Sequence, residues 1–194
     1  PLVSAYLVIL TLYLFKVVVT RAWPSGWIGN LVSGVAVTGI GALLLVHPVG
    51  ESGGQRWVAA FRRQFWIAIM PSIVMLWLAI YQRVHQYGLT EPRYFLLVLS
   101  VWLAAMAVFY AVTRSRNIAV IPATLALVAV ATFAGPWGGY AMSERSQVGR
   151  LRDALARNGM LADGSLHAAQ GAVSAADVEL VSGAVRYLVG VHGT

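Results

Sequence analysis

The sequence predicts an all-α fold: a polytopic bundle of about five transmembrane helices followed by a small C-terminal helical appendage. Five apolar runs follow one another, at residues 2–20, 27–46, 65–81, 93–112 and 118–134. Only 11% of the 194 residues are charged, and the mean hydropathy is +0.72. An ordinary soluble domain carries about 25% charged residues. At about residue 142 the composition changes to a polar and basic segment.

The length of each apolar run matches the thickness of a membrane. Roughly 17–21 residues at 1.5 Å per residue cross a hydrocarbon core of about 30 Å. We therefore expect a transmembrane domain over residues 1–141 and a small soluble helix–turn–helix appendage over residues 142–194. The chain enters its first apolar run directly after Pro1, without the signature of a signal peptide. We interpret it as a fragment of a longer protein.

The first run carries a polar stripe on one face. Tyr6, Tyr13 and Lys16 lie within an arc of about 80° on a helix with 100° per residue. Because Lys16 is close to the end of the run, its ammonium group can extend to the lipid headgroups. The alternative is a lysine that faces the bundle and takes part in a transport path.

The second run carries a row of small and polar residues at i+4 spacing: Asn30, Gly34, Thr38 and Ala42. Small residues in one row let helix backbones approach closely, which is how helices associate in lipid. We expect this row to be a helix-packing face. A groove for a substrate is the alternative.

The third run is preceded by a short basic amphipathic stretch, residues 55–64, which we expect to lie at the membrane interface. Pro71 and Pro122 lie near the starts of the third and fifth runs, where a proline breaks or kinks a helix. Broken helices often line transporter sites, so these prolines keep a transporter or channel subunit open as an alternative.

A turn with clear helix-terminating and helix-starting residues separates the third and fourth runs. Gly88 suits the position after a helix, Thr90 suits an N-cap, and Glu91 favours the positive end of the helix dipole. We interpret the surrounding group as a cap with an interfacial ion pair, and an interfacial enzyme site for a lipid-linked substrate is the alternative. The group comprises Arg83, His85, Glu91 and Arg93.

Two helices are expected in the C-terminal appendage. Val148, Leu151 and Leu155 are spaced as on one face of a helix over residues 143–158. Residues 162–165 read as a turn, and Ser174 begins a capping box before a helix over residues 178–189.

The charge pattern indicates lipid as the partner of this basic chain. The net charge is +7 and the sequence pI about 10.3, but the basic residues flank apolar runs. No basic stripe with interleaved aromatic residues lies on a soluble segment, so we expect no nucleic-acid binding. The expected partners are the bilayer and either further segments of the same chain or another membrane protein. A homo-oligomer is left open.

Sequence motifs for catalysis or for cofactor binding are not found. The chain has no cysteine, which excludes thiolate metal sites within it, and its four histidines are far apart in sequence. Neither a Walker loop nor a dinucleotide fingerprint nor a zinc-protease motif occurs. We therefore expect no enzyme activity, no cofactor and no catalytic or metal-binding residues.

The arginines of the short connections predict an orientation. The first and third connections, which share a side with the tail, contain three arginines, and the second and fourth contain five. The positive-inside rule then places the tail outside the cytoplasm. The two sets are Arg21, Arg83 and Arg93, and Arg56, Arg62, Arg63, Arg114 and Arg116.

Several local patterns resemble a bacterial multi-pass membrane family, domain of unknown function 4153. The residues that carry the resemblance are Trp23-Pro-Ser-Gly-Trp27, Tyr87-Gly-Leu-Thr-Glu-Pro-Arg-Tyr94, Gly135-Pro-Trp-Gly138, Ser146-Gln147, Arg150-Leu151, Asn158-Gly-Met-Leu-Ala-Asp-Gly164, Tyr187-Leu188 and His192-Gly193. The resemblance implies an α-helical protein of the bacterial inner membrane, with further N-terminal spans and a longer C-terminal extension. It implies no activity, cofactor or catalytic residue.

The sequence thus favours an integral membrane protein of the bacterial cytoplasmic membrane that acts as a non-enzymatic scaffold or interaction protein. A subunit of a small-molecule transporter or channel is the second hypothesis, and a membrane enzyme acting on a lipid-linked substrate is the third.

Overall fold

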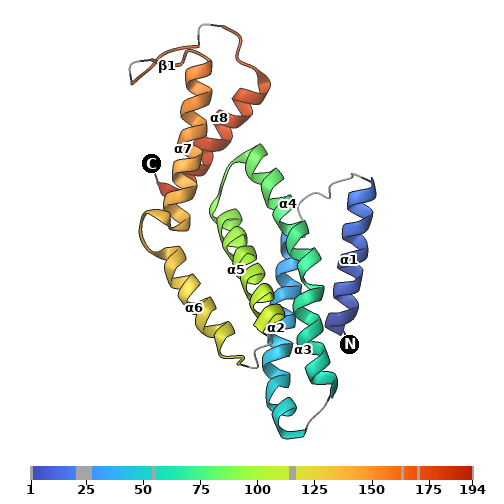
Figure 1. The fold of residues 1–194 in the computed structure, drawn as a ribbon. Coiled ribbons are helices and arrows are strands. Elements are labelled where there is room, and N and C mark those ends of the chain that lie inside the picture. The colour runs from blue at the N-terminus through green and yellow to red at the C-terminus, as the bar shows by residue number, and fades with distance from the viewer. Residues whose placement is uncertain are drawn as a thin grey trace. The chain divides into compact units, whose positions relative to one another are not determined.

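The computed structural model describes residues 2–20, 28–53, 56–113, 117–162, 164–169 and 171–193. Over these residues the chain is helical apart from one two-stranded ribbon (Figure 1). The all-α class predicted from the sequence is therefore confirmed. The first connection, with Trp23 and Trp27, lies outside the described residues.

The helices and strands follow one another without long connections among the described residues. They are α1 (Leu2–Thr20), α2 (Ile28–Gly53), α3 (Arg56–Ala68), α4 (Met70–Tyr87), α5 (Glu91–Thr113), α6 (Val120–Phe133), the short 3-10 turn η1 (Gly135–Trp137), α7 (Gly139–Arg157), β1 (Leu161–Ala162), β2 (Ser165–Leu166), α8 (Ala175–Tyr187) and the π-helical turn η2 (Leu188–His192).

The chain folds into two compact units whose borders lie inside helices. Unit 1 contains Pro1–Gln82 and Leu96–Val130, and unit 2 contains Arg83–Phe95 and Ala131–Thr194. Residues 83–95, called the hairpin segment below, therefore group with the C-terminal helices. A single boundary near residue 141 does not describe this grouping, because unit 2 is made of two separate segments of the chain.

The core of unit 1 is aromatic and aliphatic. The Trp66 ring stacks on the Tyr110 ring with their centroids 5.0 Å apart and their planes at 12°. Polar atoms on buried aromatic side chains find partners across helices. Trp77 Nε1 on α4 donates to Ser100 Oγ on α5 at 2.9 Å. Trp102 Nε1 on α5 donates to Thr124 Oγ1 on α6 at 3.0 Å.

The third apolar run differs from the prediction. The basic stretch before it is the first part of α3, which continues almost directly into α4. The interruption is at Ile69, whose amide still bonds to Phe65 O and whose carbonyl still accepts from Ile73, both at 3.0 Å. Pro71 explains the position of the break. Pro71 is the second residue of α4, where a backbone N–H would have no acceptor within the helix, so the missing N–H of proline costs nothing there.

The second run also extends beyond its predicted end. Helix α2 continues past Val46, the predicted end of the run, and past Pro48 to Gly53. A proline inside a helix removes one backbone hydrogen bond and bends the helix without always ending it.

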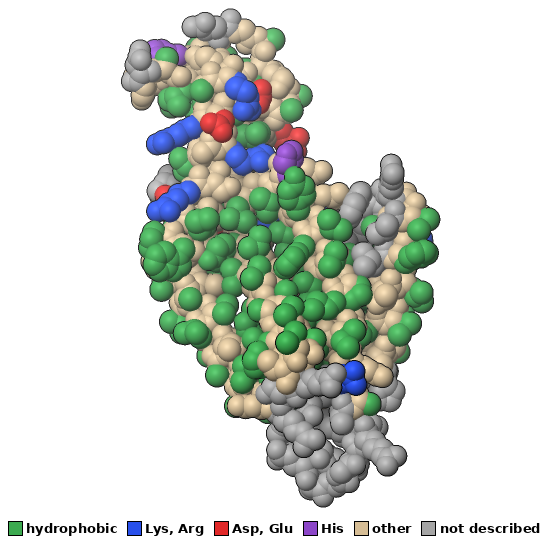
Figure 2. All heavy atoms as spheres, viewed as in Figure 1, with side chains coloured by type: hydrophobic (Ala, Val, Ile, Leu, Met, Phe, Trp, Pro, Cys, Tyr) green, Lys and Arg blue, Asp and Glu red, His purple; other side chains and the backbone are tan. Residues whose placement is uncertain are grey.

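Two helical stretches in the described residues are long and apolar enough to cross a bilayer: Arg63–Tyr87 with 25 residues and Glu91–Thr113 with 23. The other three predicted runs contain shorter apolar helices, at Val3–Val17, Asn30–Leu45 and Val120–Phe133. Figure 2 shows hydrophobic side chains over much of the visible surface of unit 1, and charged side chains gathered on α7 and α8 in unit 2.

Unit 2 is built on α7 and α8. Ser174 is the N-cap of α8 and its side chain accepts from the Asp177 amide, which confirms the N-cap half of the predicted capping box. Gly159 follows α7 with φ of +64°, as expected for a residue after a helix. The predicted turn at 162–165 joins β1 to β2, where Ala162 pairs with Ser165.

Aromatic side chains connect the hairpin segment to the end of α6 and to η1. Tyr94 donates its hydroxyl to Trp137 O at 2.6 Å, and the Phe95 and Phe133 rings lie 5.4 Å apart. Gly139 makes this packing close, since a Cβ there would lie 2.9 Å from the Tyr94 ring. A residue with a side chain fits at this position only if the Tyr94 ring shifts.

Candidate functional site

The most developed polar cluster of unit 2 surrounds the end of α4. The last carbonyl groups of a helix have no partners within the helix, so other groups must satisfy them. Gly88 follows α4 with φ of +75° and donates its amide to Val84 O at 2.8 Å. The chain thereby turns sharply toward α5, and the remaining carbonyls of the α4 end are left for partners from elsewhere.

Gln147 of α7 bonds to both sides of this turn. Its Nε2 donates to Tyr87 O at 3.2 Å and to Leu89 O at 3.1 Å. The neighbouring Ser146 accepts from the Leu89 amide at 3.0 Å. Because Gln147 is buried, these bonds replace the water that would otherwise hydrate the turn.

Two arginines complete the cap. Arg150 of α7 donates from Nη1 to His85 O at 3.2 Å and from Nη2 to Gln86 O at 2.8 Å. Arg93 of α5 donates from Nη1 to Gly88 O at 2.6 Å. A positive charge at the C-terminal end of a helix is favourable, because it lies against the negative end of the helix dipole.

The start of α5 is held by a second group of polar residues. Ser143, which is fully buried, donates to Glu91 Oε1 at 3.3 Å and to Tyr140 O at 2.9 Å. The Glu91 amide donates to the Tyr187 hydroxyl at 3.4 Å. Burial raises the pKa of the Tyr187 phenol above its ordinary value of 10.0, as does its hydrogen bond with the Glu91 carboxylate, so the phenol stays neutral at ordinary pH.

The α7 residues that contact the hairpin segment share one helix face. They have the spacing i, i+3, i+4 and i+7, and we call them the α7 polar face: Ser143, Ser146, Gln147 and Arg150. The sequence analysis did not predict this face, because it used only the spacing of the apolar residues of α7. The polar spacing was a usable signal, although it does not identify the segment that the face binds.

The predicted interfacial group is brought together in part. Arg93 lies over the Tyr87 ring, with its guanidinium carbon 5.5 Å from the ring centre, and bonds to the turn. Glu91 faces Ser143 and Tyr187. Arg83 is half-buried, and His85 is exposed at the end of α4. Arg93 therefore supports the turn, and it has different partners from the Glu91 carboxylate.

The predicted packing row of α2 lies at a groove rather than at the close helix contact. Asn30, Gly34 and Thr38 are exposed, and Ala42 is intermediate in exposure. A Cβ at Gly34 would meet nothing within 4 Å. The close approach occurs at Gly39, where a Cβ would overlap the Phe65 ring of α3.

The predicted polar stripe of α1 does not form one site in the described structure. Tyr6 is 40% exposed and lines a groove of about 440 Å³ between α1 and α2, together with Asn30 and Thr38. Tyr13 is intermediate in exposure, and Lys16 is exposed. Lys16 does not line this groove.

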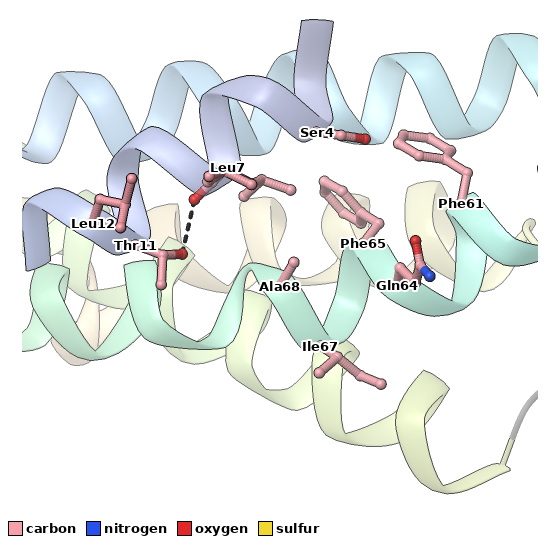
Figure 3. A pocket seen from close by; sticks show the side chains of 10 residues that line it. Ser4, Leu7, Thr11, Leu12, Phe61, Gln64, Phe65, Ile67 and Ala68 are labelled. Atoms are coloured by element: carbon pink, nitrogen blue, oxygen red, sulfur yellow. Dashed lines mark hydrogen bonds between the residues drawn. The ribbon is translucent and has the colours of Figure 1, made fainter. Parts of the chain in front are cut away.

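A second groove, of about 450 Å³, lies between α1 and α3 (Figure 3). Leu7, Leu12 and the Phe61 and Phe65 rings line most of it. The hydroxyl of Thr11 donates to Leu7 O in the same helix at 2.8 Å. The groove is therefore mainly apolar and suits a hydrocarbon chain better than a polar substrate. Over the described residues, no group of three His, Asp or Glu side chains is arranged to hold a metal ion.

Comparison with known proteins identifies a family without assigning an activity. An uncharacterized protein of Pasteurella multocida (strain Pm70) is 27% identical over 133 residues, which cover 66% of this chain and 21% of that protein. The chain thus spans about a fifth of the length of this relative. No solved structure matches the chain. The family model described as "Domain of unknown function (DUF4153)" matches residues 1–165, as the resemblance predicted. Because this match covers most of the sequence, the chain belongs to the DUF4153 family.

Proposed function

We propose that this chain is part of a multi-pass helical bundle of the bacterial cytoplasmic membrane and acts there as a non-enzymatic scaffold or interaction protein. In this proposal unit 1 lies in the bilayer. Unit 2, which holds the hairpin segment on α7 and α8, is the element that docks a partner or another part of the same protein.

The apolar character of exposed helix faces carries the membrane part of the proposal. Val112 on α5 is 76% exposed, and Leu127 and Val130 on α6 are 70% and 69% exposed. Within α6 only Ile121 and Thr132 are buried. Soluble monomers rarely expose contiguous apolar surface of this kind, whereas a bilayer solvates it.

Hydrogen bonds within unit 2 support a multi-pass arrangement. Because α7 binds the hairpin segment, the start of α5 and the start of α7 must be on the same side of a membrane. If α5 crosses the bilayer, α6 must return across it. Helix α6 has only 14 residues, so a local thinning of the bilayer or an extension beyond its helical ends would accompany the crossing.

The scaffold part rests on how the polar side chains are used. The α7 polar face and Tyr187 bond mainly to backbone groups of the hairpin segment, which fixes its shape. No group of three His, Asp or Glu side chains that could hold a metal ion occurs among the residues that the structure describes. This arrangement supports a rigid docking element rather than a catalytic site.

A transporter or channel subunit is the second candidate, supported by the groove between α1 and α2. Tyr6, Asn30 and Thr38 place polar groups along that groove. If the polar stripe of α1 forms a transport path in the complete protein, Lys16→Leu abolishes flux without affecting folding. Unchanged flux removes the stripe from consideration.

Accessibility of single cysteines tests the membrane arrangement. The sequence contains no cysteine, so His85→Cys, Val191→Cys and Asn117→Cys each add one reactive thiol to it. We expect an impermeant maleimide to label His85→Cys and Val191→Cys from one side of the membrane and Asn117→Cys from the other. All three residues labelled from the same side, or a protein released by alkaline carbonate, would refute the multi-pass proposal.

The side of the tail and the absence of turnover are tested separately. The arginine count places Val191→Cys on the periplasmic side, and labelling only after the inner membrane is opened would reverse this. The scaffold proposal fails if the purified full-length protein transports or converts a defined substrate at a rate that a point substitution abolishes. Glu91→Gln is the first substitution to test for an interfacial enzyme.

A further inference from the structure

The hairpin segment contains Arg83 and Arg93, and Arg150 of α7 bonds to it. Arg93 Nη1 bonds to Gly88 O, and Arg150 passes the same glycine closely enough that a Cβ there would lie 2.7 Å from Arg150 Cδ. Arg83 and Arg150 are both near enough to Arg93 for their charges to repel it. Arg83 and Arg93 are half-buried, so this repulsion is less screened than on an open surface.

No counter-charge is provided for these arginines among the described residues. The ion pair that the structure gives in unit 2 joins Arg157 to Asp177 and involves none of the three. The nearest acidic residue in the hairpin segment, Glu91, accepts a hydrogen bond from Ser143. The cluster therefore carries an excess of positive charge, reduced in part by the negative end of the α4 dipole.

The arginines also retain unused hydrogen-bond donors. A guanidinium group has five N–H donors. The bond to Gly88 O occupies one donor of Arg93, whose guanidinium carbon lies 5.5 Å from the centre of the Tyr87 ring. Arg83 forms no hydrogen bond within the described part of the chain. Spare, closely spaced guanidinium donors match the oxygens of a phosphate group.

The place of the cluster in the chain indicates where this phosphate comes from. Arg83 lies at the end of Arg63–Tyr87 and Arg93 at the start of Glu91–Thr113, the two stretches long and apolar enough to cross a bilayer. The ends of such helices lie among the lipid headgroups. We propose that Arg83, Arg93 and Arg150 form a binding site for the phosphate group of an anionic phospholipid. This inference rests on the membrane location proposed above.

Lipid-dependent stability of the full-length gene product tests the site. Thermal unfolding is measured in nanodiscs of phosphatidylcholine alone and with increasing phosphatidylglycerol, for the wild type and for Arg83→Gln. We expect phosphatidylglycerol to raise the midpoint of the wild type. In Arg83→Gln the phosphatidylglycerol content needed for half of this rise increases about fivefold, as for one cation lost at an anionic surface.

Two matched variants separate a built site from general attraction. Arg152→Gln removes the same charge from an exposed position of α7 outside the cluster, and it should leave the lipid dependence unchanged. Arg83→Lys keeps the charge and should restore most of the effect. Equal losses in Arg83→Gln and Arg152→Gln, or no preference for phosphatidylglycerol in the wild type, would overturn the proposal.

A further arm distinguishes a lipid from free phosphate. Inorganic phosphate added to phosphatidylcholine nanodiscs should not reproduce the stabilisation, because the site then lacks a ligand held at the membrane surface. Stabilisation by inorganic phosphate that Arg83→Gln abolishes would assign the site to a soluble phosphate compound and overturn the lipid assignment. A protein that fails the carbonate test but shows this phosphate effect would refute the membrane proposal without refuting the phosphate chemistry.

Discussion

Replacement of Gly88 by alanine is expected to loosen the hairpin segment from α7. Two physical effects act at this position. Gly88 has φ of +75°, a conformation that costs an L-residue roughly 1–2 kcal/mol. A Cβ would also lie 2.7 Å from Arg150 Cδ and 2.9 Å from Gln147 Nε2, so both side chains must move.

The size of the second effect follows from the hydrogen bonds that these side chains make. Gln147 and Arg150 together donate four bonds to backbone carbonyls around the turn. A typical bond contributes about 0.5–1.5 kcal/mol net, and flexible side chains recover part of the loss. If two of the four bonds are lost, the total destabilisation by Gly88→Ala is about 2–5 kcal/mol.

Thermal unfolding in detergent and hydrogen exchange of residues 83–95 measure this effect. Gly149→Ala is the control, because a Cβ at that helical glycine of α7 meets nothing within 4 Å and should stabilise the helix by up to about 1 kcal/mol. Gly88→Asn separates the two effects, since asparagine tolerates the backbone conformation better but keeps the overlap. The reasoning is refuted if Gly88→Ala unfolds as the wild type does and its hairpin amides exchange no faster.

Three further substitutions test other parts of the structure. Gly39→Ala should destabilise unit 1 by about 1–3 kcal/mol, because its Cβ overlaps the buried Phe65 ring. Gly34→Ala should be neutral or stabilising, because a Cβ there lies in open space. Thermal unfolding of both variants in the same detergent tests this difference. The hydrogen bonds from Arg157, Asn158 and Ser174 lower the pKa of Asp177 below its ordinary value of 3.8, so its contribution to stability is present above pH 3.8 and is lost as the pH falls through the lowered value. Hydrogen exchange at the start of α8 should therefore increase on acidification below about pH 4, and Asp177→Asn should remove this dependence; equal exchange profiles of the two proteins would contradict it. Tyr187→Phe removes the acceptor of the Glu91 amide and should accelerate exchange at that amide while leaving the Asp177 region unchanged; protection retained at Glu91 would show that the bond is dispensable.

Local signals in the sequence were sufficient for helix ends and insufficient for helix partners. Gly88 and Ser174 were predicted correctly because a left-handed glycine and an N-cap serine act on their immediate neighbours. The end of α2 was predicted too early, because the apolar run ends at Val46 whereas the helix continues through Pro48 to Gly53. The break before Pro71 was predicted in the right place, but the helical stretch before it was not.

The contact between α7 and the hairpin segment depends on residues about 60 positions apart, such as Gln147 and Tyr87. Nothing in the periodicity of either segment identifies the other. The same limitation explains the choice of the Gly34 row over Gly39 in α2. Both lie on small-residue faces of one helix, and only the position of the Phe65 ring distinguishes the face that is packed closely.

Unit 2 is assembled from two separate segments of the chain, which has a consequence for biosynthesis. The hairpin segment leaves the ribosome roughly fifty residues before the α7 polar face, a delay of several seconds at about 5–20 residues per second. During this interval the carbonyl groups at the end of α4 depend on water, lipid headgroups or an assisting protein. A pause in translation between Thr113 and Gly139 would therefore prolong the stage at which the end of α4 has no partner from α7.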